Sequence, residues 1–171
     1  WQTTYANKEF EPIGTEVLVK FGDNVLEIDN EIKKVTYTNN TNAGTATAAI
    51  ELSPAVKAMF SDAKGVDVAD MTVAFTINKA PLTASMITLT GGSQKYTGNE
   101  LTAQPSVKFN STTVLAKGTD YDVEGDTGTF PGTYTITVNG IGNYTGTPTA
   151  TWYIFADLSD TDTFEYINVY G

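Results

Sequence analysis

The chain repeats one order of short motifs, and this internal repeat constrains its fold more than any other feature. The segment YANKEFEP (5–12) corresponds to YTGNELTAQP (96–105), and AGTAT (43–47) corresponds to PGTYT (131–135). Through the middle of the repeat the copies lie 88 or 89 residues apart, a drift that indicates short loop changes. Solenoid units usually span about 20 to 50 residues. A longer period predicts two tandem modules.

The end of the repeat places the boundary between the modules near Lys79. AFTI (74–77) corresponds to TWYI (151–154), and the distance between the copies falls there to about 77 residues. The first copy therefore carries about eleven additional residues. The predicted segments are module 1 at 1–79, module 2 at 80–156, and a C-terminal strand at 157–171 that could begin a further module. The joint NKAPLT has Pro and small residues but no Gly/Ser tract, which favours a semi-rigid connection.

Apolar and polar residues alternate within each copy, as they do in half-buried strands. In the second copy Tyr134, Ile136 and Val138 fall on one face, and threonines fall on the other. Turn-forming pairs such as Lys117-Gly118 separate these runs. Hydrophobic residues make up 40% of the chain and charged residues only 18%, a composition that suits pleated strands. We predict an all-β fold made of two β-sandwiches.

One segment departs from this strand pattern. SPAVKAMFSDAKG (53–65) offers Ser53 as a helix N-cap and Pro54 as the first helical residue. Its apolar residues at helical spacing are Val56, Met59, Phe60 and Ala63, and Gly65 can end the helix. We predict a short helix or helical loop that covers one end of module 1, where the second copy has VNGIGNYTG.

The two copies also differ in how they begin. Module 2 starts with LTASMITLTGGSQ (82–94), which contains a first strand that the opening WQTT of module 1 lacks. An edge of module 1 is therefore expected to be open. The C-terminal segment carries Phe164, Tyr166 and Ile167 as the apolar residues of a strand, which could pair with its own sheet or with a neighbour's open edge.

Several of these motifs resemble those of a bacterial immunoglobulin-like repeat. They are YTGNEL (96–101), GTDYDV (118–123), PGTYTITVNGIGNYTGT (131–147) and, in the first copy, YTNNTNAGTAT (37–47). The resemblance implies that each β-sandwich is immunoglobulin-like, and that such modules act as stalks or accessory domains of exported Gram-positive surface proteins. The first copy departs from the pattern at Asp29–Ile32, which stands where Gly-Thr-Asp-Tyr is typical, and its Gly-Asn-Tyr turn is replaced by the helical segment.

Charge and composition exclude several classes of function. The net charge of −10 opposes binding to a polyphosphate backbone or to an anionic lipid surface. The chain has no cysteine and no histidine, so it has neither thiolate nucleophiles nor imidazole bases. It also has no apolar run of about 18 residues and no signal sequence. We therefore expect no membrane insertion, and a fragment of a longer protein.

Four acidic residues are the clearest candidates for a metal site. Asp120, Asp122, Glu124 and Asp126 could supply oxygen ligands to calcium. Because alternate residues of a strand share a face, the favoured interpretation is a solvated acidic stripe with no metal or other cofactor. Paired carboxylates can hydrolyse glycosidic bonds without histidine. However, sandwiches whose conspicuous residues form turns leave little room for a catalytic site, and we predict that the protein is not an enzyme.

Aromatic side chains are the candidates for ligand binding. Trp1, Trp152 and the exposed tyrosines could form a platform for the apolar faces of sugar rings. In TWYIF (151–155), alternation directs Trp152 to the opposite side from Tyr153 and Phe155. The favoured interpretation is that Trp152 packs in a core or between domains, with a glycan platform as the alternative.

Lysine crosslinks and glycosylation are less favoured. Lys20 and Lys108 fall opposite the apolar residues of their strands, so we expect them to face solvent and to form no isopeptide bond. The glycosylation patterns that begin at Asn39, Asn110 and Asn143 are explained by the Asn/Thr richness of the chain.

Together these features predict a non-catalytic structural or adhesive module, acting as a stalk or spacer of a bacterial cell-surface or secreted protein. The alternative is a carbohydrate-binding accessory module of a polysaccharide-degrading system. The expected partners are neighbouring domains of the same polypeptide, with glycans or host surface proteins as further candidates and no nucleic acid. We expect the protein to be extracellular, at the cell surface or associated with the cell wall. We expect a monomer, with strand exchange between chains as the alternative.

Overall fold

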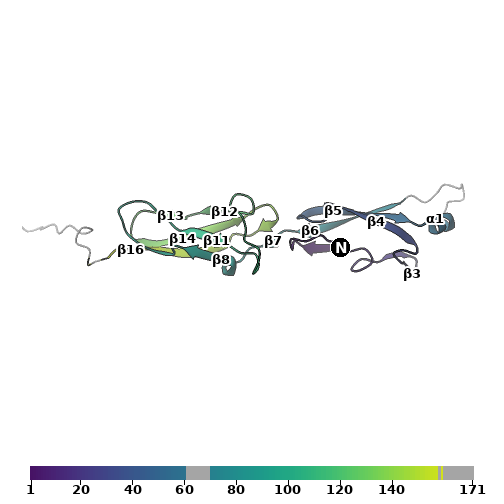
Figure 1. The fold of residues 1–171 in the computed structure, drawn as a ribbon, viewed down its shortest axis with the longest axis horizontal. Coiled ribbons are helices and arrows are strands. Elements are labelled where there is room, and N and C mark those ends of the chain that lie inside the picture. Colours follow the sequence, from purple (N-terminus) through teal and green to yellow (C-terminus); the bar gives the residue numbers. More distant parts are fainter. Residues whose placement is uncertain (61–69, 158, 160–171) are drawn as a thin grey trace, which may run out of the picture. The chain divides into compact units, whose positions relative to one another are not determined.

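The computed structural model describes residues 1–60, 70–157 and 159, and strands dominate these residues. The chain divides into two compact units, Trp1–Ala80 and Pro81–Gly171, which we call unit 1 and unit 2. Figure 1 shows the strands of each unit together with helix α1. The prediction of an all-β fold is confirmed.

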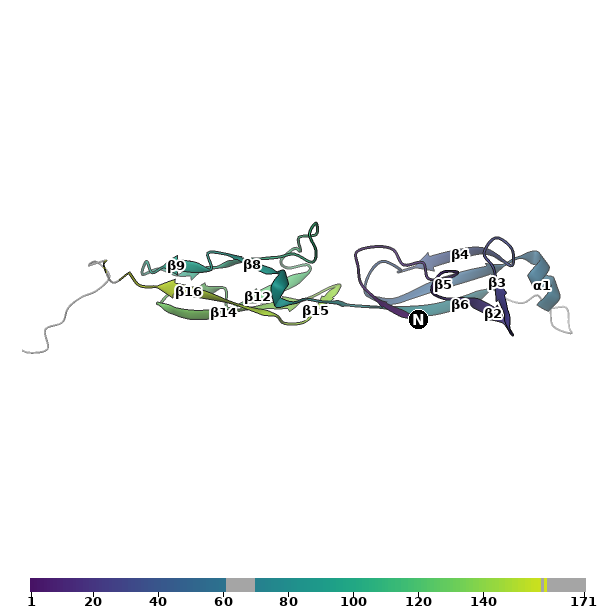
Figure 2. The same ribbon diagram turned by 90° about the horizontal axis from the view of Figure 1, so that it is seen from below.

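Unit 1 is built on a four-stranded sheet with the order β1-β6-β5-β4. Its strands are β1 (Gln2–Thr4), β4 (Ile32–Thr38), β5 (Gly44–Leu52) and β6 (Met71–Asn78). Strands β4, β5 and β6 are antiparallel to one another in turn, whereas β1 is parallel to β6. A separate two-stranded sheet, visible in Figure 2, consists of β2 (Val19–Phe21) and β3 (Asn24–Leu26).

Unit 2 repeats the four-stranded sheet strand for strand. The order is β12-β14-β16-β9, with the same strand directions and the same parallel pair, here β16 with β9. The strands are β9 (Ser93–Lys95), β12 (Tyr121–Glu124), β14 (Gly132–Gly140) and β16 (Thr149–Phe155). Two of the two-stranded sheets are β8 (Ile87–Thr90) with β11 (Gln104–Val107), and β10 (Leu101–Thr102) with β13 (Thr127–Gly128). The remaining elements are β7 (Ala80–Pro81), the 3-10 turn η1 (Ala84–Met86) and β15 (Tyr144–Thr145).

The two four-stranded sheets also share their register. Gly44 pairs with Ile77 in unit 1, and Gly132 pairs with Ile154 in unit 2. The distance between the copies is thus 88 residues at the first strand of the pair and 77 at the second. The predicted additional residues of the first copy therefore lie between β5 and β6, where unit 1 has its helix.

The separation between corresponding residues of the two copies changes from 88 to 89 residues and back, for two structural reasons. The loop between Phe21 and its partner Asn24 holds two residues, whereas the matching loop of unit 2 holds three, 110–112. A β-bulge between Ile32 and Lys34 in β4 then adds one residue to unit 1. The prediction of loop changes holds for the first difference. It was wrong for the second, because that residue is accommodated inside a strand.

Helix α1 (Pro54–Phe60) begins as the sequence predicts and lies at one end of unit 1 (Figure 1). The Ser53 hydroxyl oxygen accepts a hydrogen bond from the Val56 N–H at 3.4 Å, and the Ser53 carbonyl accepts one from the Lys57 N–H at 3.0 Å. Val56 is buried, so the helix contributes a side chain to the core. The predicted end of the helix, 61–65, lies outside the described residues.

The cores of both units consist of alternating strand residues. In β14, Ile136 and Val138 are fully buried while Thr133 and Thr135 are exposed, as the sequence pattern predicts. Ile50 takes the corresponding buried position in β5. Within the described part of the chain no polar or charged residue is buried, so apolar burial is the main stabilising contribution in each core.

The two units differ at β8. In unit 2, β8 lies before β9 in the chain and pairs with β11. Among the described strands of unit 1, β2 pairs with β3 alone. The open edge expected in module 1 corresponds to this edge of β2. The predicted C-terminal strand falls almost entirely outside the described residues.

Candidate functional site

The indole ring of Trp152 is fully buried in unit 2. It stacks on Tyr134 with ring centroids 4.7 Å apart, and its Nε1 donates a hydrogen bond to the carbonyl oxygen of Gly125 at 3.0 Å. A buried ring with a satisfied N–H offers no face to a ligand. The core role predicted for Trp152 is confirmed, and a glycan platform built on this ring is wrong.

Trp1 is only partly packed, with 40% of the residue exposed. Its ring meets Phe75 edge-on, with centroids 5.2 Å apart. Phe75 is the residue of β6 that matches Trp152 of β16. The residues Gln2 and Thr45 lie beside Trp1 around a shallow hollow. Trp1 therefore extends the aromatic packing of unit 1 and keeps part of its ring at the surface.

Tyr153 and Phe155 form a pair of exposed aromatic side chains on β16. Each is 48% exposed, and the two alternate with buried residues of the same strand. The residues directly opposite them on neighbouring strands are Thr133, Ser93 and Lys95. Directly paired residues share a face of a sheet, so the rings lie among threonine, serine and lysine side chains. We call this surface, formed by these five residues, the β16 face.

Unit 1 does not have the corresponding rings. Thr76 and Asn78 hold the matching positions of β6. The β16 face is therefore specific to unit 2, although both sheets have the same register. The alternation of TWYIF predicted how Tyr153 and Phe155 are oriented but did not single them out as a site. The sequence feature that could have identified them is an aromatic residue at both positions of the strand that face away from the core.

Only two of the four acidic residues of the predicted stripe lie on one strand. Asp122 and Glu124 are exposed on β12, but Asp120 and Asp126 lie outside this strand. Asp126 forms an ion pair with Lys117 at 3.1 Å. The expectation that all four alternate along one strand was wrong, because β12 is only four residues long. In the described ranges, no three acidic side chains come together as ligands for a metal ion.

Asp120 holds a turn that both units contain. Its Oδ2 accepts a hydrogen bond from the Ala116 N–H at 2.9 Å, and in unit 1 Glu31 Oε2 accepts one from the Glu27 N–H at 3.0 Å. In both turns the acid stands immediately before the first residue of a strand, β4 or β12. The Gly-Thr-Asp-Tyr motif and the segment Asp29–Ile32 thus build one kind of turn, in which the acid stabilises the backbone.

Two tyrosines have raised pKa values for structural reasons. Burial raises the pKa of the Tyr121 hydroxyl, which donates a hydrogen bond to the Pro105 carbonyl at 3.4 Å. Burial also raises the pKa of Tyr37, although its oxygen accepts a hydrogen bond from the Ile13 N–H at 3.0 Å. A raised pKa keeps both phenols protonated near neutral pH, so neither is poised to act as a base.

The remaining candidates have surface or turn positions. Lys20 and Lys108 are exposed, as their strand positions predict. Asn110 Oδ1 accepts hydrogen bonds from the N–H groups of Thr112 at 3.0 Å and Thr113 at 2.7 Å, so this asparagine forms a turn.

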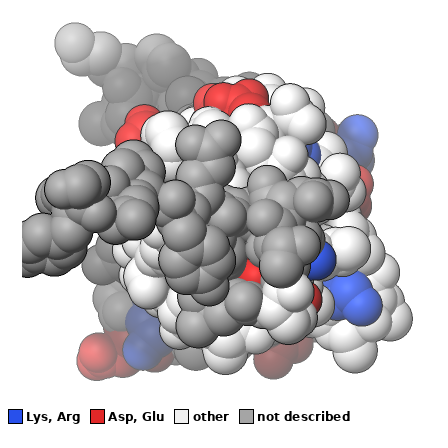
Figure 3. Space-filling model, turned by 90° about the vertical axis from the view of Figure 1, so that its left-hand side faces the viewer, with Lys and Arg blue, Asp and Glu red and all other residues white. Residues whose placement is uncertain are grey.

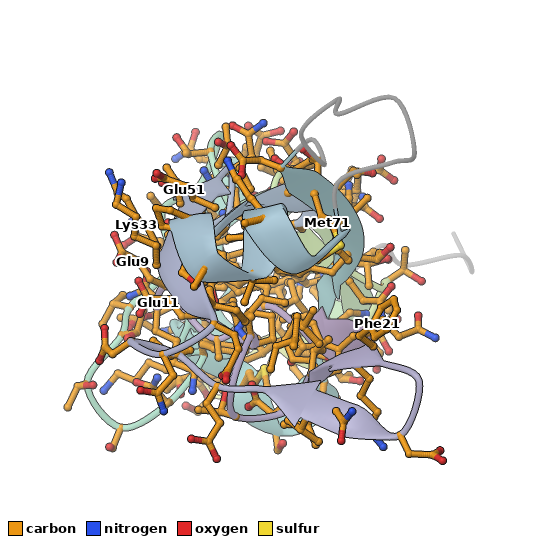
Figure 4. All side chains as sticks on the ribbon, turned by 90° about the vertical axis from the view of Figure 1, so that its right-hand side faces the viewer. Glu9, Glu11, Phe21, Lys33, Glu51 and Met71 are labelled. Carbon is orange, nitrogen blue, oxygen red and sulfur yellow. The ribbon has the colours of Figure 1, made fainter. Side chains whose placement is uncertain are left out.

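Both acidic and basic side chains lie on the surface. On the face drawn in Figure 3, red and blue groups are both visible among uncharged atoms. Figure 4 labels Lys33 and Glu51, which form an exposed ion pair at 2.7 Å. Exposed pairs of this kind contribute little to stability. No helix in the described ranges has the length and apolar character needed to cross a membrane.

Comparison of the chain with models of protein families, with curated proteins and with solved structures found no match. The β16 face and the repeated turns are therefore interpreted from their own geometry.

Proposed function

We propose that this chain is a non-catalytic spacer of a bacterial cell-surface or secreted protein, built of two tandem immunoglobulin-like β-sandwiches. The observation that carries the proposal is the repetition of one four-stranded sheet, strand for strand and in one register, in unit 1 and unit 2. Repetition of a self-contained unit adds length to a protein without adding a new site, which is what a spacer needs.

The core of unit 2 supports the assignment of a sandwich. Val107 of β11 and Leu115 are buried together with Ile136 and Trp152 of the four-stranded sheet. A β-sandwich is defined by an apolar interior to which two sheets contribute alternate residues.

The roles of the conspicuous side chains support a scaffold rather than a catalyst. Tyr121, Tyr144 and Trp152 are buried, and Asp120 and Asn110 accept backbone hydrogen bonds in turns. Each of these residues stabilises the fold through packing or through a turn. The proposed role therefore depends on the length of the chain and on its attachment to neighbouring domains.

Small-angle X-ray scattering of the full chain tests the spacer. A single compact globule of this length would have a radius of gyration of about 16 Å. After extrapolation to zero concentration, which removes any association between chains, a spacer predicts a value well above this that is unchanged between low and high salt. A measured radius close to the globular value would contradict the proposal, since the chain would then add little length between its attachment points.

Carbohydrate binding is a second candidate function, favoured by the β16 face. Aromatic rings bind the apolar face of a sugar, and neighbouring hydroxyl and ammonium groups can bond its hydroxyls. Affinity electrophoresis against a panel of soluble polysaccharides is the test. Retardation that is lost in Tyr153→Ala and Phe155→Ala supports this candidate. The matched control is Phe130→Ala, because Phe130 is 68% exposed but lies outside the β16 face. Equal retardation of all three variants would contradict it.

A further inference from the structure

The free edge of β2 is where unit 1 departs most clearly from unit 2. In unit 2, Val107 of β11 is paired with Ile87 of β8, and the Lys108 N–H donates a hydrogen bond to the Met86 carbonyl at 2.9 Å. In unit 1, the strand in the equivalent position is β2, and its only strand partner within the described residues is β3.

Corresponding side chains of the two units differ in how far they are exposed to solvent. Val19 pairs with Leu26 in unit 1, and in unit 2 the Val107 carbonyl accepts a hydrogen bond from the Leu115 N–H at 2.9 Å. Val107 is 0% exposed and Leu115 is 5% exposed, whereas Val19 and Leu26 are both partly exposed. Because each pair of corresponding residues consists of the same residue type, the difference in exposure comes from the neighbouring segments, such as β8 in unit 2, that cover the side chains. Leu18, beside Val19, is 53% exposed.

The backbone of β2 is oriented to accept another strand. Successive residues of a strand direct their N–H and C=O groups to opposite edges. Lys20 corresponds to Lys108, and the Lys108 N–H is directed toward β8. The Lys20 N–H is therefore directed toward the free edge of β2. An apolar strip beside an unpaired strand edge is a site for β-strand addition.

We propose that the free edge of β2 binds the segment 163–167 of a second copy of this chain as an added antiparallel strand. The segment reads TFEYI, in which Phe164 and Tyr166 alternate with a charged residue. The strand β8 reads ITLT and presents Ile87 and Leu89 in the same alternation.

The position of the segment in the sequence supports this occupant. ADLS (156–159) matches APLT (80–83), which leads into β8 in unit 2. The sequence separation between Ala156 and Phe164 differs by only one residue from the separation between Ala80 and Ile87. The segment 163–167 thus follows the last strand of unit 2 in the sequence, as β8 follows the last strand of unit 1. A second copy of the chain can therefore provide β2 with a strand partner, as β8 is the strand partner of β11.

Sedimentation velocity over a range of concentrations tests the proposal on the full chain, together with hydrogen–deuterium exchange at Leu18–Lys20. The expected result is a mass that rises with concentration toward a dimer or longer assembly, with slower exchange at these amides in the associated form. The double variant Phe164→Ser/Tyr166→Ser should remain monomeric and lose the protection. Tyr170→Ser, which changes an aromatic residue outside the segment, should associate like the parent chain.

Lys20→Pro gives an independent test from the other side of the contact. Proline removes the N–H that is directed at the free edge and leaves the pairing of β2 with β3 in place. Association should weaken by about fivefold to tenfold, the effect of one lost backbone hydrogen bond. A monomeric mass for the parent chain at every concentration would overturn the proposal. Association that persists in Phe164→Ser/Tyr166→Ser would also overturn it. The same holds if the Leu18–Lys20 amides of a monomer are protected from exchange and lose this protection in Phe164→Ser/Tyr166→Ser.

Discussion

Asp29 and Gly118 take the same left-handed backbone conformation at the same point of one repeated turn. Their φ angles are 69° and 84°, and their N–H groups donate to Ile32 O at 2.9 Å and to Tyr121 O at 2.7 Å. Glycine adopts this conformation freely, whereas a residue with a Cβ atom is strained by about 1 kcal/mol. We predict that Asp29→Gly stabilises unit 1 by about this amount.

Urea unfolding followed by circular dichroism measures the change at Asp29. The control is Asp23→Gly, which alters an exposed aspartate of another turn without relieving a positive φ and should not stabilise the chain. A loss of stability in Asp29→Gly would show that the aspartate side chain contributes more than its backbone strain removes.

The burial of Trp152 predicts a large loss of stability on truncation. Trp152→Ala should destabilise unit 2 by about 3–5 kcal/mol, because it leaves a cavity in the core. Trp152→Phe keeps most of the ring but leaves the Gly125 carbonyl without its donor, and should cost about 1–2 kcal/mol. Denaturant unfolding followed by circular dichroism is the measurement. The neighbouring exposed variant Tyr153→Ala should stay within about 0.5 kcal/mol of the parent. A loss in Tyr153→Ala as large as that in Trp152→Ala would contradict this account of the core.

Gly125 combines two constraints that a larger residue cannot meet. Its φ is 76°, and a Cβ atom added there would collide with the Thr135 carbonyl oxygen. Gly125→Ala should therefore destabilise unit 2 by at least about 2 kcal/mol. Gly118→Ala is the matched control, because Gly118 also has a positive φ but faces open space. Its loss should be only about 1 kcal/mol. Equal losses in differential scanning calorimetry would mean that the collision is relieved by a local shift.

The hydrogen bond from the Ala116 N–H to Asp120 predicts a different result for two neighbouring acids. Asp120→Ala removes the acceptor and should destabilise unit 2 by about 1 kcal/mol. Asp122→Ala changes an exposed acid on β12 and should alter stability by less than about 0.5 kcal/mol. Thermal unfolding of the two variants at one pH compares them directly. If the two midpoints fall by the same amount, the loss does not come from the Asp120 turn and the prediction is contradicted.

Tyr37 and Tyr121 predict an alkaline loss of stability. The folded pKa of each phenol lies above the ordinary value of 10.0, because burial disfavours the phenolate. As the pH rises, the unfolded chain loses these protons first. The stabilisation is therefore complete below about pH 10 and is lost as the pH passes through the folded pKa.

The double variant Tyr37→Phe/Tyr121→Phe should show a shallower fall in unfolding free energy from about pH 9 to about pH 11 than the parent chain. Urea titrations at fixed pH steps give both slopes. An unchanged slope would assign the alkaline loss to other groups.

Much of this fold follows from local pattern, and the rest depends on contacts that no local pattern contains. Alternation predicted the buried face of β14 and the direction of Trp152, because strand geometry fixes which side chains share a face. It failed for Asp120 and Asp126, since the four-residue strand β12 begins after Asp120 and ends before Asp126. The exposure of Tyr153 also depends on what neighbouring chain segments leave uncovered. The sequence therefore predicted its direction but not its place in a candidate site.

The parallel pairing of β1 with β6, which β9 and β16 repeat in unit 2, has a consequence for how unit 1 carries force. The pairs are extended by hydrogen bonds from Tyr5 N–H to Asn78 O at 2.8 Å and from Tyr96 N–H to Phe155 O at 2.9 Å. A pull on the start of β1 and on the end of β6 drives two parallel strands in opposite directions along their axes. The hydrogen bonds between them are then loaded in shear, all at once, and must break together. Antiparallel ends would instead open one bond at a time, so this arrangement makes the β1–β6 pair of unit 1 a mechanical clamp under tension.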